Sequence, residues 1–329
     1  MSKAIAIVGC GGIGARHAQA LGRTVFDTVV YALDPDERAT ERAAALFADS
    51  KKATGSPATI VRCHHYAELG SPLDVAIVAT RASERLRSLE QLLEVGAVRH
   101  LILEKFLFSR RDHFAIAKAL LNRLGVSAWV NCPRRIYPGY QEIATRMQDS
   151  RFVHIEVSAS AKVAPIGTIG IHFVDLLQFL CGSCTAPTRL SLTDAQLVPG
   201  NRNLSDFSGM LEAFYGSKRL LRYAAIAETD APLVVSIVGD NIRYVVDESN
   251  QCIYASSAQN RWRFEMGEFP VPLQSGLTHA VAEDLIATGT CGLTPYCDSA
   301  AVHVAMLDAI LCSYRAIEDD LFLEELPFT

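Results

Sequence analysis

The N-terminal stretch constrains the fold of this chain more than any other part of it. Residues 4–21 read AIAIVGCGGIGARHAQAL, an apolar run that breaks into three spaced glycines and continues in a helical pattern. The run before Gly9 predicts a strand buried on both faces. Gly9, Gly11 and Gly14 supply a tight turn, a close backbone approach and close helix-on-strand packing. Glycine turns also serve as purely structural bends, but the strand before and the helix after this one predict a Rossmann dinucleotide site.

An acidic residue stands where such a site needs one. A second strand, residues 29–33, ends at Asp34, which lies 20 residues after Gly14. A carboxylate there accepts hydrogen bonds from the adenosine ribose and repels a 2′-phosphate, so NAD is predicted, with NADP left open by the nearby Arg38. A structural alternative is that Asp34 and Asp36 only cap the next helix. The predicted cofactor-binding residues are Gly9, Gly11, Gly12, Ile13, Gly14, Asp34, Thr80 and Glu104.

The first part of the chain alternates strands and helices. Apolar runs predict further strands at residues 59–62, 74–79, 100–103 and 126–130, with helices ending near residue 47 and spanning 83–95 and 111–124, and with a loop at 49–57. This alternation is typical of an α/β, doubly wound parallel sheet, in which ligands bind at the carboxyl ends of the strands. We expect residues 1–131 to form a dinucleotide-binding Rossmann domain.

After residue 131 the pattern changes to successive strands. Strand-like segments are expected at residues 152–158, 189–198, 209–215, 219–226, 233–238, 243–247, 252–255 and 261–264, with helices at 169–181, 277–288 and 299–317. This pattern predicts an α+β domain over residues 132–329 with a mostly antiparallel open sheet, which would bind substrate and mediate oligomerisation.

Composition excludes several classes of protein. The 329 residues are 50% hydrophobic and 20% charged, with a net charge of −5 and no concentrated basic block. We therefore expect no nucleic-acid partner and no membrane partner, and a cytoplasmic protein. The nine cysteines do not suggest a disulfide framework. Cys181 and Cys184 have metal spacing without a second ligand pair, and Cys63-His64-His65 offers too few ligands, so no metal is predicted.

Two groups of residues are candidates for catalysis. Glu104-Lys105 follows the fifth strand, where desolvation would lower the pKa of Lys105 and let it exchange a hydroxyl proton; the alternative is a pair of solvated charges. His172 is expected in the first turn of a helix capped near Thr168, where the helix dipole favours a neutral imidazole that Asp175 could orient. The alternative is a histidine that only packs.

These patterns, in their order along the chain, resemble the glucose–fructose oxidoreductase/inositol dehydrogenase (Gfo/Idh/MocA) family. The matching patterns are Gly9-x-Gly11-x-x-Gly14, Asp34, Glu104-Lys105, the segment from Asn131 to Pro138 with Arg134, Arg135 and Tyr137, Gly170-x-His172-x-x-Asp175, and Asp298-Ser299. The resemblance implies an NAD(P)-binding domain and an open-sheet domain that shapes a sugar or cyclitol pocket. It also implies that Lys105 contacts the reacting hydroxyl and that His172 assists proton transfer.

The sequence departs from the family pattern at two positions. Phe106 stands where the family has a proline that often follows a cis bond; because a cis bond before another residue costs about 3 kcal/mol, a trans bond is expected here. Thr168 stands where the family has an aspartate, so this position offers a hydrogen bond but no negative charge to orient the substrate.

A positive substrate wall is expected after the sixth strand. Arg134 and Arg135 are adjacent, Tyr137 is close, and Lys162 lies before the His172 helix. Bidentate arginine contacts favour an anionic or nucleotide-linked sugar, while the alternative is that one arginine simply pairs with a carboxylate at the domain junction. The predicted substrate-binding residues are thus Lys105, Arg134, Arg135, Tyr137, Lys162, Thr168 and His172.

The sequence thus predicts an NAD(P)-dependent dehydrogenase or reductase acting on CH–OH groups, which interconverts a secondary alcohol and a ketone on a sugar, sugar derivative or cyclitol. Lys105 and His172 are the expected catalytic residues, and a homo-oligomer, dimer or tetramer, is expected. Two alternatives stay open: a non-catalytic, NAD-responsive sugar-binding regulator, and a redox-neutral enzyme that keeps its NAD bound.

Overall fold

The chain forms two compact units. The computed structural model describes residues 2–200 and 204–327. Unit 1 comprises Met1–Phe108, Asp112–Asn131 and Pro272–Tyr296, and unit 2 comprises Ser109–Arg111, Cys132–Val271 and Cys297–Thr329. The chain changes unit after Asn131, where the sequence predicts a domain boundary, but it returns to unit 1 at Pro272 instead of continuing one uninterrupted second domain.

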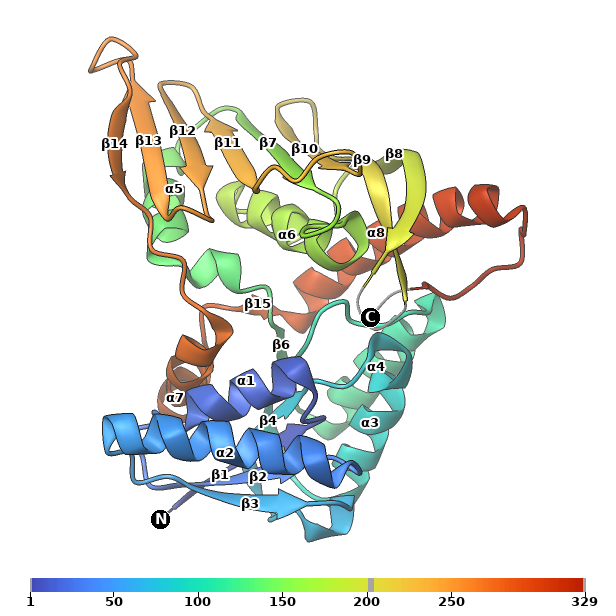
Figure 1. Ribbon diagram of the computed structural model, residues 1–329. Coiled ribbons are helices and arrows are strands. Elements are labelled where there is room, and N and C mark those ends of the chain that lie inside the picture. Colours follow the sequence, from blue (N-terminus) through green and yellow to red (C-terminus); the bar gives the residue numbers. More distant parts are fainter. Residues whose placement is uncertain (1, 201–203, 328–329) are drawn as a thin grey trace. The chain divides into compact units, whose positions relative to one another are not determined.

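Unit 1 is built on a seven-stranded sheet in the order β15-β6-β5-β4-β1-β2-β3 (Figure 1). Its strands are β1 (Lys3–Val8), β2 (Thr28–Leu33), β3 (Thr59–Cys63), β4 (Leu73–Val78), β5 (Val98–Leu103), β6 (Ser127–Val130) and β15 (Thr294–Pro295). β1 pairs in parallel with both β2 and β4, so the strand order reverses at β1. This is the predicted doubly wound sheet, and its ligand position is the carboxyl ends of the strands at the reversal.

Four helices connect the parallel strands. They are α1 (Gly12–Leu21), α2 (Glu37–Thr54), α3 (Ala82–Val95) and α4 (Arg111–Leu124), and a short 3-10 turn (Tyr66–Glu68) precedes β4. α1 and α2 lie side by side in front of the sheet in the view of Figure 1, and α3 and α4 form a second pair. Because parallel strands are covered on both faces, β1 and β4 are almost entirely buried and apolar.

The returning segment completes unit 1. It contains a 3-10 turn (Gln274–Gly276), α7 (Thr278–Thr288) and β15, which pairs antiparallel with β6. The Glu283 carboxylate accepts a hydrogen bond from the Val25 backbone at 2.8 Å. The Tyr296 hydroxyl donates to the Phe114 carbonyl at 2.9 Å. These contacts are the physical reason why the segment joins unit 1, although its sequence alone indicated only a helix after the second sheet.

Unit 2 contains an eight-stranded sheet in the order β14-β13-β12-β11-β7-β10-β9-β8. Its strands are β7 (Val153–Ser160), β8 (Arg189–Pro199), β9 (Ser205–Tyr215), β10 (Arg219–Ile226), β11 (Val234–Val238), β12 (Ile242–Asp247), β13 (Cys252–Ser257) and β14 (Glu265–Glu268). Only β7 and β10 pair in parallel, so the sheet is mostly antiparallel, as predicted.

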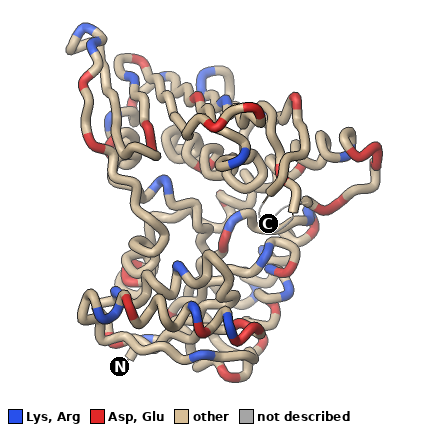
Figure 2. The backbone as a smooth tube through the Cα atoms, in the orientation of Figure 1, with Lys and Arg blue, Asp and Glu red and all other residues tan. Residues whose placement is uncertain are grey.

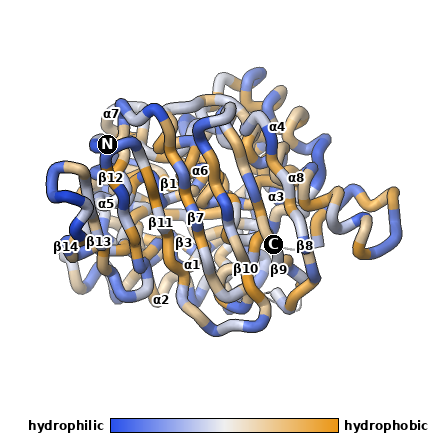
Figure 3. The backbone as a smooth tube through the Cα atoms, turned by 90° about the horizontal axis from the view of Figure 1, so that it is seen from above, coloured by the Kyte–Doolittle hydropathy of each residue, from blue (hydrophilic) through white to orange (hydrophobic). Residues whose placement is uncertain are grey.

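One face of this sheet packs on helices. Along β7 buried and exposed residues alternate, and Figure 3 shows hydrophobic and hydrophilic positions alternating along the strands of this sheet. α6 (Ile171–Leu180) lies against β7 and β10 and is buried at every position except Phe179. A π-helical turn (Ile166–Gly170) leads directly into α6. The core of unit 2 therefore surrounds the helix that carries His172.

Two expected elements differ from the structure, and one helix was not expected. α2 continues to Thr54, because the polar residues after Phe47 form the exposed side of the helix, which ends only at Gly55 in a left-handed conformation. The strand expected at 261–264 is absent, since Arg261 and Trp262 have φ angles of 57° and 60°, and β14 begins at Glu265 instead. α5 (Pro138–Met147) was not predicted, although proline at its first position was an available signal.

The last long helix is apolar. α8 (Tyr296–Glu318) has 23 residues and a mean hydropathy of 1.4, so by length and composition it could cross a membrane. A core helix passes the same test, and Val302, Met306 and Ile310 form a buried stripe along α8. Burial of this stripe gives a reason for the apolar composition of the helix.

Charged residues are interspersed over the described chain (Figure 2). Several exposed ones form ion pairs, including Arg62 with Glu41 and Arg222 with Glu212. Within residues 2–200 and 204–327, no disulfide bond joins two cysteines, and no group of three or more His, Cys, Asp or Glu residues is arranged to hold a metal.

Candidate functional site

The glycine turn after β1 is shaped for close approach of another backbone or a ligand. Gly9 has a φ angle of 90°, and a Cβ atom on it would lie 3.0 Å from the Ala79 carbonyl carbon and the Thr80 nitrogen. A Cβ atom on Gly14 would lie 1.8 Å from the Gly9 oxygen. Only glycine fits these two positions, because any side chain would collide with backbone.

The start of α1 is open to an anion. The N-cap residue, Gly11, provides no side-chain hydrogen bond, and Gly12 and Ile13 are exposed in the first turn. Uncapped N–H groups and the positive end of the helix dipole favour a phosphate at this place. The residues present therefore fit the pyrophosphate of a dinucleotide.

Asp34 lies at the end of β2 beside this turn. Its carboxylate accepts hydrogen bonds from the backbone N–H groups of Cys10, at 2.8 Å, and Asp36, at 2.9 Å. The helix cap of α2 is Asp36, whose carboxylate accepts from the Arg38 N–H at 3.0 Å. The two acids therefore have different roles: Asp36 caps α2, whereas Asp34 holds the backbone of the glycine turn. The Arg42 guanidinium lies 3.4 Å from the Cys10 carbonyl, on the same turn.

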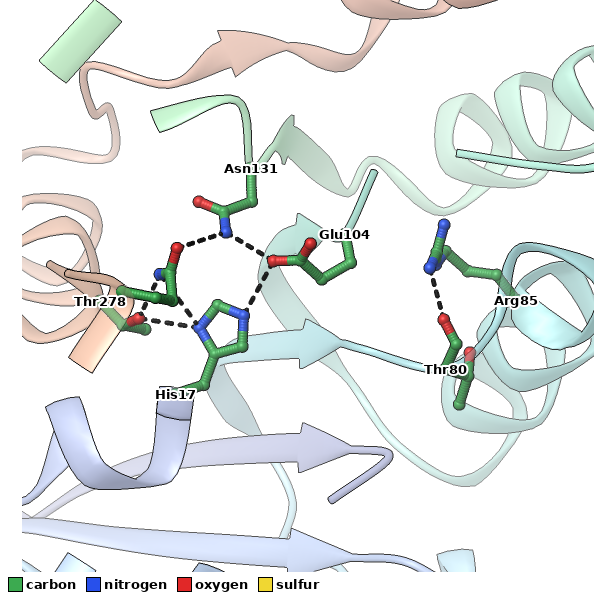
Figure 4. Close-up of polar contacts among 7 residues, drawn as sticks. His17, Thr80, Arg85, Glu104, Asn131 and Thr278 are labelled. Atoms are coloured by element: carbon green, nitrogen blue, oxygen red, sulfur yellow. Dashed lines mark hydrogen bonds and ion pairs between the residues drawn. The ribbon is translucent and has the colours of Figure 1, made fainter. Parts of the chain in front are cut away.

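A buried polar network holds the end of β5 (Figure 4). Glu104 is 3% exposed, and its Oε1 atom accepts hydrogen bonds from Asn131 and from His17 Nε2, the latter at 3.0 Å. His17 Nδ1 lies 2.8 Å from the Thr278 hydroxyl. Gln274 completes the network through its amide, 2.9 Å from both Asn131 Nδ2 and the Thr278 hydroxyl. Four side chains from three other chain segments thus fix Glu104, the residue that precedes Lys105.

The network keeps Glu104 ionised. Burial by itself raises the pKa of Glu104, but hydrogen bonding and charge from His17, the charge of Lys105 and the Asn131 bond outweigh burial, and the resulting pKa lies below the usual value. Lys105 itself is half-buried beside this carboxylate. The structure thus has a buried acid and a partly covered lysine, and not the pair of solvated charges that was the alternative.

The peptide bond after Lys105 is cis, which contradicts the trans bond expected from the sequence. That expectation used only the preference of an isolated peptide, whereas here Phe106 is fully buried and surrounding contacts hold the segment. The buried Arg85 guanidinium of α3 donates to the carbonyls of Phe106, Leu107 and Thr80. Burial lowers the pKa of Arg85 to about 10, and Glu104 opposes this shift. Arg85 thereby ties the segment after β5 to Thr80 (Figure 4).

His172 lies in α6 of unit 2 and is 7% exposed. The helical path starts at Ile166, because the π-helical turn precedes α6, so Thr168 is inside this turn and is not the helix cap. His172 is consequently one turn further from the helical start than the sequence predicted. Asp175 was expected to orient His172. In the structure the Asp175 carboxylate accepts two hydrogen bonds from Arg135, one from Nε and one from Nη2, both at 3.0 Å.

The two adjacent arginines form ion pairs with different carboxylates. Arg134 makes a bidentate pair with Glu248 at 2.8 and 2.7 Å, and its guanidinium lies 4.2 Å from the centre of the Phe173 ring. Arg135 pairs with Asp175 as described. Tyr140 also donates to Glu248, at 2.7 Å, and Tyr137 is 8% exposed. Each arginine charge is thus matched by a buried carboxylate, which is the alternative to a positive wall.

Lys162 is exposed and pairs with the equally exposed Asp230 at 2.7 Å. Its charge is therefore also matched within unit 2. A carboxylate that sequence reasoning missed is Asp206 of β9, which accepts hydrogen bonds from the backbone of Gly167 at 2.7 Å and of Thr168 at 3.1 Å. No local sequence signal marked Asp206, because it lies 38 residues away from Thr168 along the chain.

Unit 1 thus has the fold and the site geometry of a dinucleotide-binding Rossmann protein. Residues 3–132 match the Gfo/Idh/MocA family model, described as an oxidoreductase family with an NAD-binding Rossmann fold. This match confirms the resemblance predicted from the sequence and the assignment of NAD for residues 3–132. No curated protein matches the sequence.

Solved structures share the fold over nearly the whole chain. UDP-N-acetylglucosamine 3-dehydrogenase GnnA from Acidithiobacillus ferrooxidans is 17% identical with a TM-score of 0.67, covering 94% of this chain and 97% of that one. An oxidoreductase from Agrobacterium radiobacter in complex with NAD+, L-tartaric acid and magnesium is 13% identical with a TM-score of 0.71, covering 94% and 95%. A super-repressor mutant of Gal80p from Saccharomyces cerevisiae is 12% identical with a TM-score of 0.71, covering 96% and 97%. Identities this low establish the shared fold and no common substrate.

Proposed function

We propose that this protein is an NAD-dependent oxidoreductase that interconverts a secondary alcohol and a ketone on a sugar, sugar derivative or cyclitol. The observation that carries the proposal is the position of Lys105. It follows β5 directly, beside the buried Glu104, and β5 and β1 end at the same edge of a parallel sheet. The glycine turn and Asp34 lie at that edge, so a dinucleotide bound there would bring its reactive ring toward Lys105.

Each residue then has a defined task. Bound NAD supplies the acceptor or donor of hydride at the substrate carbon. The Lys105 side chain contacts the reacting hydroxyl and takes or returns its proton, because partial burial of Lys105 favours its neutral amine. His172 of unit 2 is the second residue that we assign to the movement of this proton. In the oxidising direction one alcohol and NAD+ give one ketone, NADH and one proton.

The arginine pairs guide the choice of substrate. Because Arg134 and Arg135 each face a buried carboxylate, their charges give no reason to prefer an anionic substrate. We therefore place neutral sugars and cyclitols first and keep nucleotide-linked sugars as the second class, since GnnA, which shares the fold, is a UDP-N-acetylglucosamine dehydrogenase.

The test is a screen of sugars, cyclitols, nucleotide sugars and sugar acids with NAD and with NADP, following nicotinamide absorbance. On an identified substrate, Lys105→Met should lower kcat by about 10²- to 10⁴-fold, the usual contribution of a positioned acid or base, with little change in NAD affinity. Lys118→Met is the matched control, because Lys118 is exposed on α4 and should tolerate the change. Full activity of Lys105→Met would place the proton path elsewhere.

A second candidate is an NAD-responsive sugar-binding regulator. The shared fold with Gal80p and the neutral Thr168 favour this candidate. A protein that binds sugar and NAD in calorimetry without any hydride transfer would support it. A redox-neutral enzyme is the third possibility, and it would instead purify with its nucleotide in place and convert substrate without net change in nicotinamide absorbance.

A further inference from the structure

Asp206 anchors the turn that leads into the His172 helix. Its side chain is 1% exposed. One carboxylate oxygen accepts hydrogen bonds from the backbone of Gly167 and of Phe207, both at 2.7 Å, and the other accepts from the Thr168 backbone at 3.1 Å. The Thr168 hydroxyl also bonds to this carboxylate. Hydrogen bonds to an ionised acceptor are stronger than neutral ones, so Asp206 is a firm attachment point.

The same turn is fixed at two further places. A Cβ atom on Gly170 would lie 3.1 Å from Leu211 Cδ2 and equally close to Met306 Cε, so the turn packs tightly against β9 and α8. Upstream of the turn, the buried Tyr223 hydroxyl donates to the Ala164 carbonyl at 2.6 Å. The backbone from Ala164 to Gly170 is therefore docked onto β9 and β10 by both polar and apolar contacts.

We infer that Asp206 is a positioning residue for the reaction: it fixes the Ile166–Gly170 turn, and through it the start of α6 and the direction of His172. This inference rests on the proposed function only for its catalytic consequence. The anchoring itself lies wholly within unit 2, in the contacts between β9 and the turn.

The neutral side chain of Thr168 suits its position beside the Asp206 carboxylate. Burial raises the pKa of Asp206, although the N–H groups of Phe207, Gly167 and Thr168 and the Thr168 hydroxyl oppose the shift. A second carboxylate at position 168 would lie beside an acid that is already costly to ionise, and two adjacent carboxylates cannot both ionise cheaply. A hydroxyl that donates to the acid is the better partner, so the negative charge at this turn comes from β9.

The experiment compares Asp206→Asn, Thr168→Asp and the double variant by thermal unfolding. Asp206→Asn leaves backbone donors without an acceptor, and Thr168→Asp adds a like charge, so each single change should lower Tm by about 4 °C or more. In the double variant the carboxylate is moved to position 168, so Tm should fall by clearly less than the sum. Asp230→Asn is the matched control, since Asp230 is exposed and should leave Tm almost unchanged.

A second readout follows His172 without requiring turnover. The rate of its modification by diethyl pyrocarbonate, measured by peptide mass spectrometry, should rise several-fold in Asp206→Asn, because His172 is nearly buried when the turn is anchored. The affinity for NAD should not change. On an identified substrate, kcat should fall while KM changes little, and the double variant should recover part of kcat.

Additive losses of Tm in the double variant, or a Thr168→Asp protein that is more stable than the wild type, would overturn the inference. If Asp206→Asn does not fold, Thr168→Val tests the same anchor by removing only the hydroxyl, and an unchanged His172 modification rate would then count against it. Non-additive Tm values in a protein without hydride transfer would leave the anchor intact and refute the proposed oxidoreductase function alone.

Discussion

The two units stabilise their buried carboxylates in different ways. In unit 1, Glu104 accepts hydrogen bonds from the side chains of His17 and Asn131, which are themselves held by Gln274 and Thr278. In unit 2, Glu248 and Asp175 each face the planar fork of an arginine. In the first arrangement the carboxylate lies next to the half-buried Lys105 in sequence, whereas in the second each carboxylate forms an ion pair with an arginine. A count of charges along the sequence therefore says little about the charge that a ligand meets.

The strongest test of this comparison is to remove one partner of an arginine pair. Arg134→Met should destabilise the protein by about 3–5 kcal/mol, because Glu248 would be left as a buried charge without its partner. The free energy of unfolding in urea is the measurement. Arg222→Met is the matched control, since the Arg222–Glu212 pair is half exposed. A small loss of stability combined with a large loss of substrate affinity would return Arg134 to a substrate-binding role.

The corresponding change in unit 1 should cost less. Glu104→Ala removes the acceptor of two buried side-chain donors, and we expect a loss of about 2–3 kcal/mol in the same urea experiment. Glu41→Ala, which breaks only an exposed pair with Arg62, serves as the control. A cost at or below that of the control would mean that the network does not stabilise unit 1.

The pH dependence of stability should have opposite signs for the acids of the two units. The pKa of Glu104 is lowered, so its contribution is present above its ordinary pKa of 4.5 and is lost as pH falls toward the lowered value. The pKa of Asp206 is raised, so ionising it costs stability as pH rises above 3.8. From pH 4 to pH 7, the stability advantage of the wild type should therefore grow over Glu104→Gln and shrink over Asp206→Asn. Denaturant titrations across this range measure both slopes, and slopes of the same sign would contradict the assignment.

The smallest effect is expected at Lys162. Its pair with Asp230 is exposed on both sides, so Lys162→Met should change the free energy of unfolding by no more than about 0.5 kcal/mol. Substrate affinity, measured by calorimetry on an identified substrate, is the more informative readout. A clear loss of affinity would mean that Lys162 binds substrate, as the sequence predicted. Unchanged affinity would mean that Lys162 is not a substrate-binding residue.

Much of unit 1 could be predicted because its signals are local. Steric contacts with neighbouring backbone require glycine at positions 9 and 14, and the acid at position 34 follows from its place at the end of a strand. Apolar runs revealed the buried parallel strands. The signals failed where a helix has one polar face, as at the end of α2, and where two left-handed residues, Arg261 and Trp262, interrupt a strand-like run.

The sequence by itself determined the order of elements, the dinucleotide turn and the residues that follow each strand, because short-range sterics and hydrophobic periodicity encode them. Only the tertiary structure decided which polar and charged side chains pair with each other. Asn131 meets Gln274 across 143 positions of sequence, and Arg134 meets Glu248 across 114. Pairings of this kind depend on which strand ends and helices come together when the apolar surfaces are buried, and no local pattern records them. The charge at each candidate site is therefore a property of the fold.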